Sequence, residues 1–478
     1  MQKYKFFFAE QKRIIFADMK HFFFLVLAFA LAACSGIKYA DKYGFLPGND
    51  AVTNSKAFQR CLDGGGRIRV RMPGEYKLCR TVFLDSDTDL EFAEGAVLSR
   101  AEDADGVAAR FVLLNRGAQN RKFDENIVIR NLQLRANGID AGNGRPVDIP
   151  TTVGMCCHTG FFYVKNLLLD GYTFLDLPPN DFAIQICTFE NAVVENVHIE
   201  GMKDAVHFGT GRNVVVRHGI FKTYDDPIAL NAHDYTTSNP ELGWIENGLI
   251  EDCTDLDDPE RGTTGFFARI LAGGWRNWEP GMEIQSSGDA VVCAGSIYRS
   301  NGPKEKVSYK SLCRPEHDEG TLTYPDGITW TMSQDRGVCY SCGVRNVVFR
   351  DIHLAKKRKV ALCLHFDHDQ YSRSFYPHGE IPVQSNIVFD RVFVENEIPA
   401  LIQSRTPVDS IILRNSNIGS SEIRLLHALD TEGMVYDTTV VRLENVVADD
   451  LAGMVKTAGR PVRIVGVPGA EAKLIDNK

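Results

Sequence analysis

The sequence predicts an all-β protein whose main body is a right-handed parallel β-helix with a small inserted β-domain. Short β-branched strands recur along the chain, each followed by a polar pair and a second apolar stretch. The clearest successive units begin about 22 to 24 residues apart, which is typical of stacked coils. A doubly wound α/β fold fits less well, because no long amphipathic helical period separates the strands. The units begin at Ile127, Val164, Ala192, Val214, Val347, Ile387 and Ile411.

The first coils are predicted from the segment that precedes these units. Residues 55–62 can form a short α-helix, which would cap the open end of the stack against pairing with other chains. Residues 64–70 then enter the first coil, residues 73–76 (Pro-Gly-Glu-Tyr) are typical of a turn, and residues 90–98 predict the next coil. The chain therefore begins its β-helix with a capped end.

The repeat stops between residues 274 and 334, where aromatic and turn residues cluster, including three of the four tryptophans. We expect a small β-domain here, inserted between β-helix segments at 34–273 and 335–478. It resembles the β modules attached to chitinases and phage tail fibres, in residues 288–291 (Gly-Asp-Ala-Val), Tyr298 and 326–330 (Asp-Gly-Ile-Thr-Trp). Exposed rings would make the domain carbohydrate-binding, whereas buried rings would only fill its core.

The N-terminus predicts export. Lys20 and His21 precede an apolar run at residues 22–30, and Leu-Ala-Ala-Cys follows at 31–34, which describes a signal peptide over residues 1–33 with Met19 as its start. The run is too short to cross a bilayer, which needs about 20 apolar residues. Its end resembles a lipobox, whose cysteine, here Cys34, is lipidated. We expect a monomer held by its lipid in the cell envelope of a Gram-negative bacterium, facing the periplasm or on the outer membrane.

The charge of the chain argues against one class of partner, and its cysteines suggest possible disulfides. The formal net charge of −9 argues against nucleic acid, because phosphate binding needs a clustered basic surface. One basic run, residues 356–359 (Lys-Lys-Arg-Lys), is expected to be a solvated coil corner. In an oxidising compartment, Cys61 with Cys79 and Cys339 with Cys342 are candidate disulfides.

The candidate catalytic residues lie between residues 203 and 235. Asp204 lies about one coil before the pair Asp225 and Asp226, and equivalent positions on neighbouring coils stack about 4.8 Å apart. Clustered carboxyl groups suit glycoside hydrolysis, in which one protonates the leaving oxygen and another activates water or attacks carbon. Crowding also raises the pKa of one carboxyl group and keeps it protonated near neutral pH.

These aspartates resemble the polygalacturonase-like family of glycoside hydrolases, which has the pectin-lyase fold. The family carries Asn-Thr-Asp-Gly, then Gly-Asp-Asp-Cys-Ile-Ala-Leu about one coil later, and Asp204, Asp225, Asp226 and residues 228–230 (Ile-Ala-Leu) match it. The resemblance covers most of the mature chain outside the insert. It implies inverting hydrolysis of a polysaccharide or oligosaccharide without a cofactor. Asp225 would be the general acid, and Asp204 and Asp226 would hold the water.

The chain departs from the family pattern around these residues. Pro227 replaces the cysteine, and only residues 246–248 (Glu-Asn-Gly) approach the family's Gly-His-Gly. Residues 269–271 (Arg-Ile-Leu) keep one of the two basic residues of Arg-Ile-Lys. Because those basic residues hold a uronate, a neutral or differently linked sugar is as good a candidate as polygalacturonate. Candidate substrate contacts beside the aspartates are His207, Asn231, His233, Asp234 and Arg269.

A second group of ionisable and aromatic residues follows late in the chain. It is denser than a coil needs for packing, so it predicts a loop over the same cleft. Arg373 would bind an acidic group and Tyr371 or Tyr376 would stack on a sugar ring. Asp367 and Asp369 would be the ligands if the loop bound a metal, although their spacing matches no ligand motif. The candidates in this group are His365, Asp367, Asp369, Tyr371, Arg373 and Tyr376.

Two other functions compete with hydrolysis. In a polysaccharide lyase, the aspartates would bind Ca²⁺ and Lys203 or Arg269 would remove a proton, which requires a lowered pKa and is easier for lysine. In a non-catalytic glycan-binding surface lipoprotein, the aspartates would only cap coil corners. Ca²⁺ dependence and an unsaturated product would identify the lyase.

Overall fold

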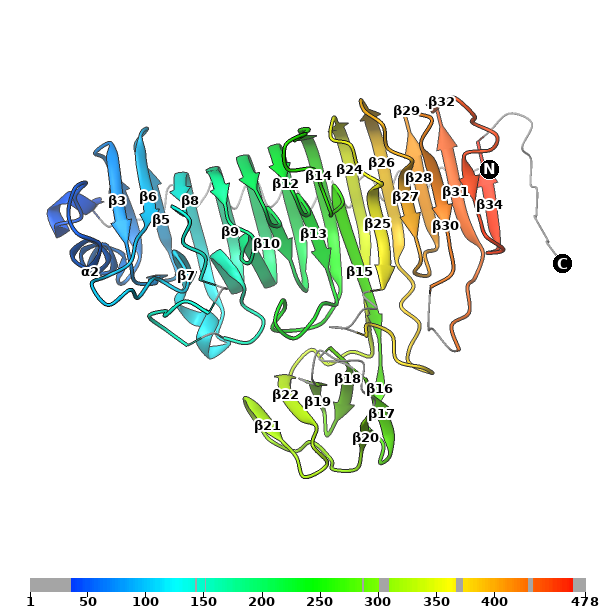
Figure 1. Cartoon of the computed structure of the whole chain (residues 1–478), viewed down its shortest axis with the longest axis horizontal. Coiled ribbons are helices and arrows are strands. Elements are labelled where there is room, and N and C mark those ends of the chain that lie inside the picture. The colour runs from blue at the N-terminus through cyan, green and yellow to red at the C-terminus, as the bar shows by residue number, and fades with distance from the viewer. Residues whose placement is uncertain are drawn as a thin grey trace.

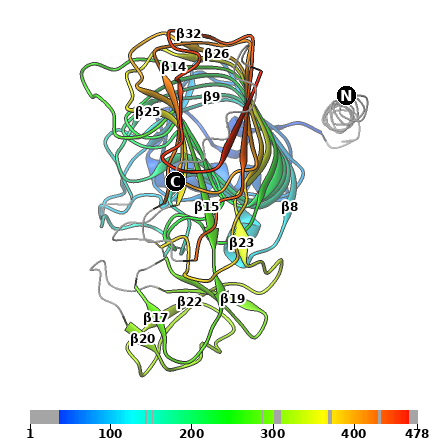
Figure 2. The same ribbon diagram turned by 90° about the vertical axis from the view of Figure 1, so that its right-hand side faces the viewer.

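The computed structural model describes residues 36–141, 144–150, 152–285, 288–300, 309–366, 373–428 and 433–466. Its main body is a 27-stranded sheet that winds from coil to coil. The pairing between successive coils is parallel, as in β10 (Phe182–Gly201) against β12 (Gly211–Thr223). Figure 1 shows the coils stacked along one long axis, and Figure 2 looks along that axis. The predicted right-handed parallel β-helix is confirmed.

The strands follow one another around and along this axis. The first coils contain β1 (Lys38–Tyr39), β2 (Gly66–Val70), β3 (Gly74–Leu78), β4 (Val82–Leu84), β5 (Thr88–Phe92), β6 (Ala96–Arg100) and β7 (Leu113–Asn115). The long strands of the central coils, besides β10 and β12, are β8 (Asp124–Arg135), β9 (Cys157–Leu177), β14 (Ile245–Asp255), β24 (Val344–Leu354) and β26 (Ser385–Val394). One face continues from β10 through β11 (Val206–Phe208), β13 (Ile228–Asn231), β15 (Ala268–Gly274), β25 (Val360–Phe366), β27 (Ala400–Ser404) and β30 (Glu422–Leu425). The last coils add β28 (Ser410–Arg414), β29 (Asn417–Gly419), β31 (Thr439–Glu444), β32 (Val447–Ala448), β33 (Val455–Lys456) and β34 (Val462–Val465).

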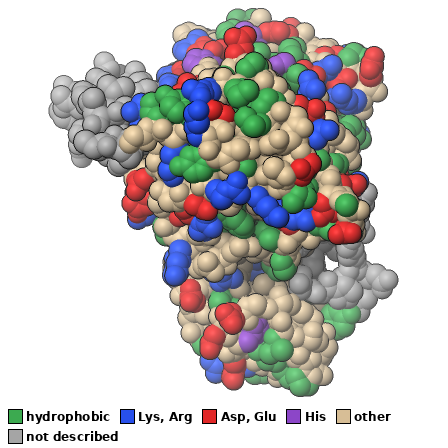
Figure 3. Space-filling view, turned by 90° about the vertical axis from the view of Figure 1, so that its left-hand side faces the viewer, with side chains coloured by type: hydrophobic (Ala, Val, Ile, Leu, Met, Phe, Trp, Pro, Cys, Tyr) green, Lys and Arg blue, Asp and Glu red, His purple; other side chains and the backbone are tan. Residues whose placement is uncertain are grey.

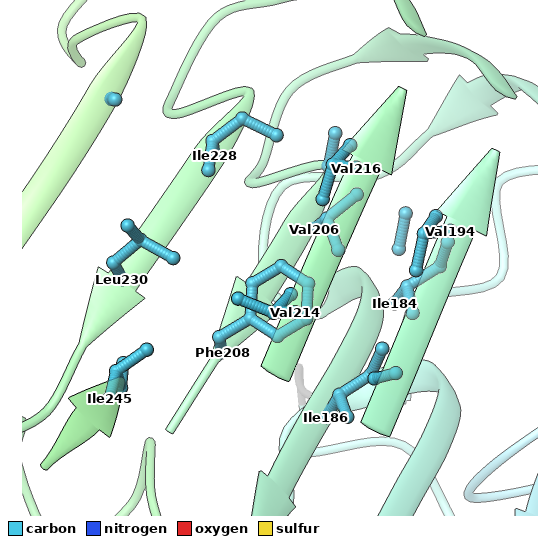
Figure 4. Close-up of a cluster of buried hydrophobic side chains, with 14 of the residues drawn as sticks. Ile184, Ile186, Val194, Val206, Phe208, Val214, Val216, Ile228, Leu230 and Ile245 are labelled. Atoms are coloured by element: carbon cyan, nitrogen blue, oxygen red, sulfur yellow. The ribbon is translucent and has the colours of Figure 1, made fainter. Parts of the chain in front are cut away.

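The core consists of apolar side chains that stack in rows inside the coils. Ile184, Val206 and Ile228 lie in register on β10, β11 and β13, and all three are fully buried (Figure 4). Alternation along each strand places the next residue on the outer face, so His207 points away from the core between Val206 and Phe208. Burial of each such apolar side chain contributes about 1.5–3 kcal/mol.

One corner of the helix is an asparagine ladder. At this corner, seven asparagines adopt positive φ angles of 53° to 62°, a conformation that asparagine tolerates better than most side chains. Six of the seven side-chain amides donate to the asparagine of the preceding coil over 2.9–3.3 Å, and the first, Asn126, donates to Asp87. The ladder therefore links seven coils through side chains as well as through the backbone. Its members are Asn126, Asn166, Asn191, Asn213, Asn247, Asn346 and Asn386.

Asn213→Ala is expected to destabilise the protein by about 3 kcal/mol. Roughly 1 kcal/mol comes from placing alanine at a positive φ, and about 1 kcal/mol from each of two lost ladder bonds. Asn213→Gly keeps the backbone conformation and should lose only the bonds. Urea unfolding of the two variants separates the contributions, and equal stability of Asn213→Ala and the wild type would contradict the role of the ladder.

The first coil is capped by a helix, as predicted. The helix α2 (Ala51–Leu62) begins four residues earlier than expected, because the Asp50 side chain accepts a hydrogen bond from Thr53 N at 2.9 Å. Phe58 of α2 stacks on Phe45 at 4.2 Å and closes the apolar core. Positive and negative side chains are interspersed over this end of the molecule (Figure 3). The turn expected at residues 73–76 is wrong beyond Pro73, because β3 already begins at Gly74.

The residues of the predicted insert form sheets of their own beside the β-helix (Figures 1 and 2). One sheet has the order β16-β18-β19-β22-β21, and β17 pairs with β20. The rings of Trp275, Tyr298 and Trp330 are at most 3% exposed. Stacking of these three rings on sugars is therefore ruled out, because they fill the core. The strands are β16 (Arg276–Asn277), β17 (Met282–Ile284), β18 (Ala290–Cys293), β19 (Ser296–Ser300), β20 (Tyr309–Ser311), β21 (Thr321–Thr323) and β22 (Thr329–Gln334), and β23 (Ser341–Cys342) returns to β15.

Two expectations about charged and sulfur-bearing residues are wrong. The basic run is not a solvated corner, because Lys356 and Arg358 are buried. Arg358 forms a bidentate ion pair with Asp255 at 2.6 and 3.0 Å, and neither side chain has exposed surface. The candidate disulfides do not form, since every cysteine that the structure describes is free. Burial instead raises the pKa of Cys61 to about 11.

The predicted signal peptide and the lipidation candidate Cys34 lie outside the described residues. Within the described part of the chain, no helix is both long enough and apolar enough to span a bilayer.

Candidate active site

The three aspartates come together because neighbouring strands follow them. Asp204 lies two residues before β11, and Asp226 lies two residues before β13. β11 pairs with β13 in register, and Ala205 N donates to Asp226 O at 2.9 Å. As a result, one carboxyl oxygen from each of Asp204, Asp225 and Asp226 lies within 4.8 Å of the others. The structure thus places the predicted catalytic residues in one cluster.

Exposure differs sharply within this cluster. Asp204 and Asp226 are 2% and 1% exposed, whereas the side chain of Asp225 keeps 23% of its surface. The backbone N–H of Phe266 donates to Asp226 Oδ1 at 2.7 Å. Gly265 packs so closely that a β-carbon there would lie 2.5 Å from the same oxygen. Asp225 is therefore the carboxyl group of the cluster that a substrate can touch.

Lys203 supplies a positive charge to the cluster. Its ammonium group donates to Asp225 Oδ2 and lies 3.6 Å from Asp204 Oδ1. Burial would lower the pKa of Lys203, but the two carboxylates raise it above its usual range. Lys203 therefore stays protonated and partly neutralises the buried charge.

The environment pushes the carboxyl pKa values in opposite directions. Burial alone would raise the pKa of Asp204, but Lys203 and the hydrogen bond from His207 lower it below its usual range. Burial and the negative charge of Asp204 raise the pKa of Asp225. Burial and both neighbouring carboxyl groups raise the pKa of Asp226 well above its usual range. One site thus holds an ionised carboxylate beside carboxyl groups that retain a proton to higher pH.

His207 fixes the orientation of Asp204 from the outer face of β11. Its Nδ1 lies 3.1 Å from Asp204 Oδ2, and its Nε2 lies 3.2 Å from Asn239 Oδ1 and 3.6 Å from Asp234 Oδ2. The ring also stacks on Phe182 at 4.0 Å with an interplanar angle of 13°. Both ring nitrogens lie beside side-chain oxygens, so the ring is held in one orientation. His207 has no exposed surface, so it orients Asp204 and does not contact the substrate in this conformation.

The remaining early candidates surround this arrangement. Arg269 lies on β15 beside Ala229. Its positive charge lowers the pKa of Asp204 further and partly offsets the rise in the pKa values of Asp225 and Asp226. Asn231 donates to Asp234 Oδ2 at 2.7 Å, and both are buried. His233 is also buried, with its ring 6.0 Å from that of Trp275. Of these four predicted substrate contacts, the structure thus leaves Arg269 partly accessible and covers the other three.

The late candidates divide between the site and the insert. His365 lies on β25 beside Leu271, 2.9 Å from Cys363 Sγ. Arg373, in contrast, forms a buried bidentate pair with Asp289 at 3.0 and 2.6 Å, and Tyr376 donates to Glu283 O. Arg373 and Tyr376 therefore attach their loop to the insert, which occupies the groups predicted to bind an acidic group and a sugar ring. Asp367, Asp369 and Tyr371 lie outside the described residues.

Three residues of this region were not among the predicted site residues. Lys203 appeared only as a candidate lyase base, although it stands beside Asp204 in the sequence. Asn239 contacts His207 from a loop, and Arg299 reaches that loop from the insert. These last two contacts join residues 32 and 65 positions apart, and no local pattern announces such contacts.

No protein-family model and no curated protein matches the chain. Among solved structures, the family 28 exopolygalacturonase of Yersinia enterocolitica is 15% identical, with 90% of this chain and 80% of that chain covered and a TM-score of 0.48. The exopolygalacturonase of Thermotoga maritima is 12% identical, with 87% and 92% covered and a TM-score of 0.46. The surface adhesin PfbA of Streptococcus pneumoniae is 11% identical, with 89% and 93% covered and a TM-score of 0.40. Polygalacturonases, which the aspartate motifs resemble, are thus among the similar structures.

Proposed function

We propose that the protein is a glycoside hydrolase that cleaves a polysaccharide or oligosaccharide at the cluster of Asp204, Asp225 and Asp226. The observation that carries the proposal is the cluster itself: its carboxyl oxygens lie within 4.8 Å of one another, and Asp225 is partly exposed while the other two aspartates are buried. This environment shifts the pKa values of Asp204 and Asp225 in opposite directions. Glycoside hydrolysis needs an acid that is still protonated and a carboxylate that is already ionised, side by side. We further propose that the chain reaches the cell envelope and is lipidated at Cys34.

Asp225 is the general acid in this mechanism, because it is the exposed member of the cluster and its pKa is raised. Its proton passes to the glycosidic oxygen as the bond to the anomeric carbon breaks. A water molecule attacks that carbon and gives a proton to the ionised Asp204. Because Asp204 and Asp226 are at most 2% exposed, neither can reach the anomeric carbon as a nucleophile. Water is therefore the attacking group in this mechanism, and inversion is part of the proposal.

The lyase alternative is weakened by Lys203. A lysine base must lose its proton near neutral pH, but the carboxylates raise the pKa of Lys203. The Lys203 ammonium also bonds to Asp225 Oδ2, so it occupies an oxygen that a Ca²⁺ ion would need. The aspartate cluster therefore has its countercation in the chain itself.

The test is product release from a panel of plant, algal and host glycans. We expect new reducing ends from one glycan with the wild type, and none with Asp225→Asn at equal binding. An unsaturated, ultraviolet-absorbing product would identify a lyase instead. Binding of a glycan without any cleavage would identify a recognition protein.

The rate should be highest on the acid side of neutrality. Asp225 must be protonated, so kcat/KM should fall as pH rises through its raised pKa. Asp204 must be ionised, and its lowered pKa keeps it so below the usual carboxyl range. Lys203→Met removes a charge that lowers the Asp204 pKa, and should move the acidic limb of the profile to higher pH. A rate that rises steadily with pH would contradict the assignment of Asp225 as acid.

A further inference from the structure

We propose that the inserted β-domain is a positioning module for the candidate active site, and that Arg299 is its main contact. In this proposal, which rests on the proposed function, the insert holds a loop that orients His207, and His207 orients Asp204. The domain then acts on catalysis through this loop.

The loop in question is the covering loop, residues 232–244, which joins β13 to β14. It lies across the outer face of the strands that carry the site. Gln185 Nε2 donates to Ser238 O at 2.5 Å, and Asn239 Nδ2 donates to Asn231 O at 2.6 Å. These bonds place Asn239 directly over His207, whose Nε2 lies 3.2 Å from Asn239 Oδ1.

The insert contacts the covering loop through the buried guanidinium group of Arg299. Arg299, on β19, has no exposed surface. It donates to the carbonyl oxygens of Asp234 at 3.2 Å and Thr236 at 3.4 Å, and also to Asn239 O. Burial lowers the pKa of Arg299 to about 10, so the group remains charged at neutral pH. A buried cation is tolerated only where such acceptors satisfy it, which makes this contact geometrically demanding.

Strand β22 of the insert adds two further contacts with the covering loop. Ser333 Oγ donates to Pro240 O at 2.8 Å, and Leu242 N donates to Gln334 Oε1 at 2.7 Å. The loop is thus held at both of its halves by side chains of the insert. These contacts give the insert a structural role beside the candidate active site, whereas its buried aromatic rings only fill its own core.

The consequence for the site follows along one chain of contacts. Asn239 and Asp234 both belong to the covering loop, and both face His207 Nε2. His207 Nδ1 in turn faces Asp204 Oδ2 at 3.1 Å. A loop that drifts removes the partners of Nε2 and frees the ring to turn away from Asp204. Displacement of a reacting group by about 1 Å can cost about 100-fold in rate.

The experiment compares Arg299→Met and Arg299→Lys with the wild type. We expect kcat to fall about 100-fold in Arg299→Met with little change in KM, because substrate contacts are untouched. Hydrogen exchange of the covering loop should become faster. Arg299→Lys keeps the charge and should recover part of both properties. Arg314→Met is the matched control, because Arg314 is an exposed arginine of the insert whose side chain donates to Cys293.

The outcomes separate this proposal from the proposed function. If folded Arg299→Met keeps the wild-type kcat or the wild-type exchange of the covering loop, the insert does not position the site. If the wild type cleaves no glycan, the proposed function fails. Hydrogen exchange of the covering loop is then the remaining test. Faster exchange in Arg299→Met supports the proposal that Arg299 fixes the loop, and exchange equal to that of the wild type overturns it.

Discussion

Asp225→Asn is expected to lower kcat on the natural glycan by about 100- to 10,000-fold, the usual contribution of a general acid. Asparagine has nearly the same shape as aspartate but carries no acidic proton. It can still accept a hydrogen bond from Lys203, so the local structure should persist. We therefore expect KM and the unfolding midpoint to stay close to those of the wild type.

Asp252→Asn is the control for this variant. Asp252 lies on β14, its side chain is 60% exposed, and its positive φ of 50° suits asparagine equally well. It should keep full activity. If Asp225→Asn also keeps full activity, the acid must lie elsewhere, and His365 becomes the first residue to test.

Arg358→Met is expected to destabilise the protein by about 3–5 kcal/mol, because it leaves Asp255 as an uncompensated buried charge. The ion pair between Arg358 and Asp255 has no exposed surface on either side chain. Arg358 Nη1 also donates to Thr263 Oγ1 at 2.9 Å, and that hydroxyl donates to Tyr224 O at 3.0 Å. The variant should thus disturb the backbone just before Asp225 and reduce activity as well.

Two comparisons test this explanation by urea unfolding. Adding Asp255→Leu to Arg358→Met removes the orphaned charge and should recover most of the lost stability. Arg212→Met breaks an exposed pair with Glu190, whose side chains are 58% and 33% exposed, and should cost less than about 1 kcal/mol. Equal losses for Arg212→Met and Arg358→Met would contradict the importance of burial.

The parts of the fold that repeat along the chain could be predicted from the sequence. Each coil carries its own strand and corner residues. The segment from Val214 therefore predicts the same structure as the segment from Ala192, and the two residues pair in register on β12 and β10. The carboxyl cluster was predictable for the same reason, because Asp204 and Asp225 stand about one coil apart. Local spacing is sufficient wherever the structure itself is periodic.

Contacts between distant segments could not be predicted in this way. The run at residues 356–359 looked solvated because its partner Asp255 lies 103 positions before Arg358. The aromatic residues of the insert were compatible with either a sugar-binding surface or a core, and only packing distinguishes the two. The hydrogen bond from Arg299 to Asp234 O joins residues 65 positions apart, so no short-range sequence pattern predicts it. The sequence therefore located the carboxyl groups and named His207 and Arg269 beside them, but it did not reveal that Asn239 and Arg299 hold His207 and the loop in place.

The most direct test of the central claim is the dependence of Asp225→Asn on the leaving group. Once the panel names the sugar, its dinitrophenyl glycoside offers a leaving group that departs without protonation. If Asp225 is the general acid, Asp225→Asn should cleave this glycoside at nearly the wild-type rate while it remains inactive on the natural glycan. If the variant loses both activities to the same extent, Asp225 does not donate the proton and the proposed mechanism is wrong.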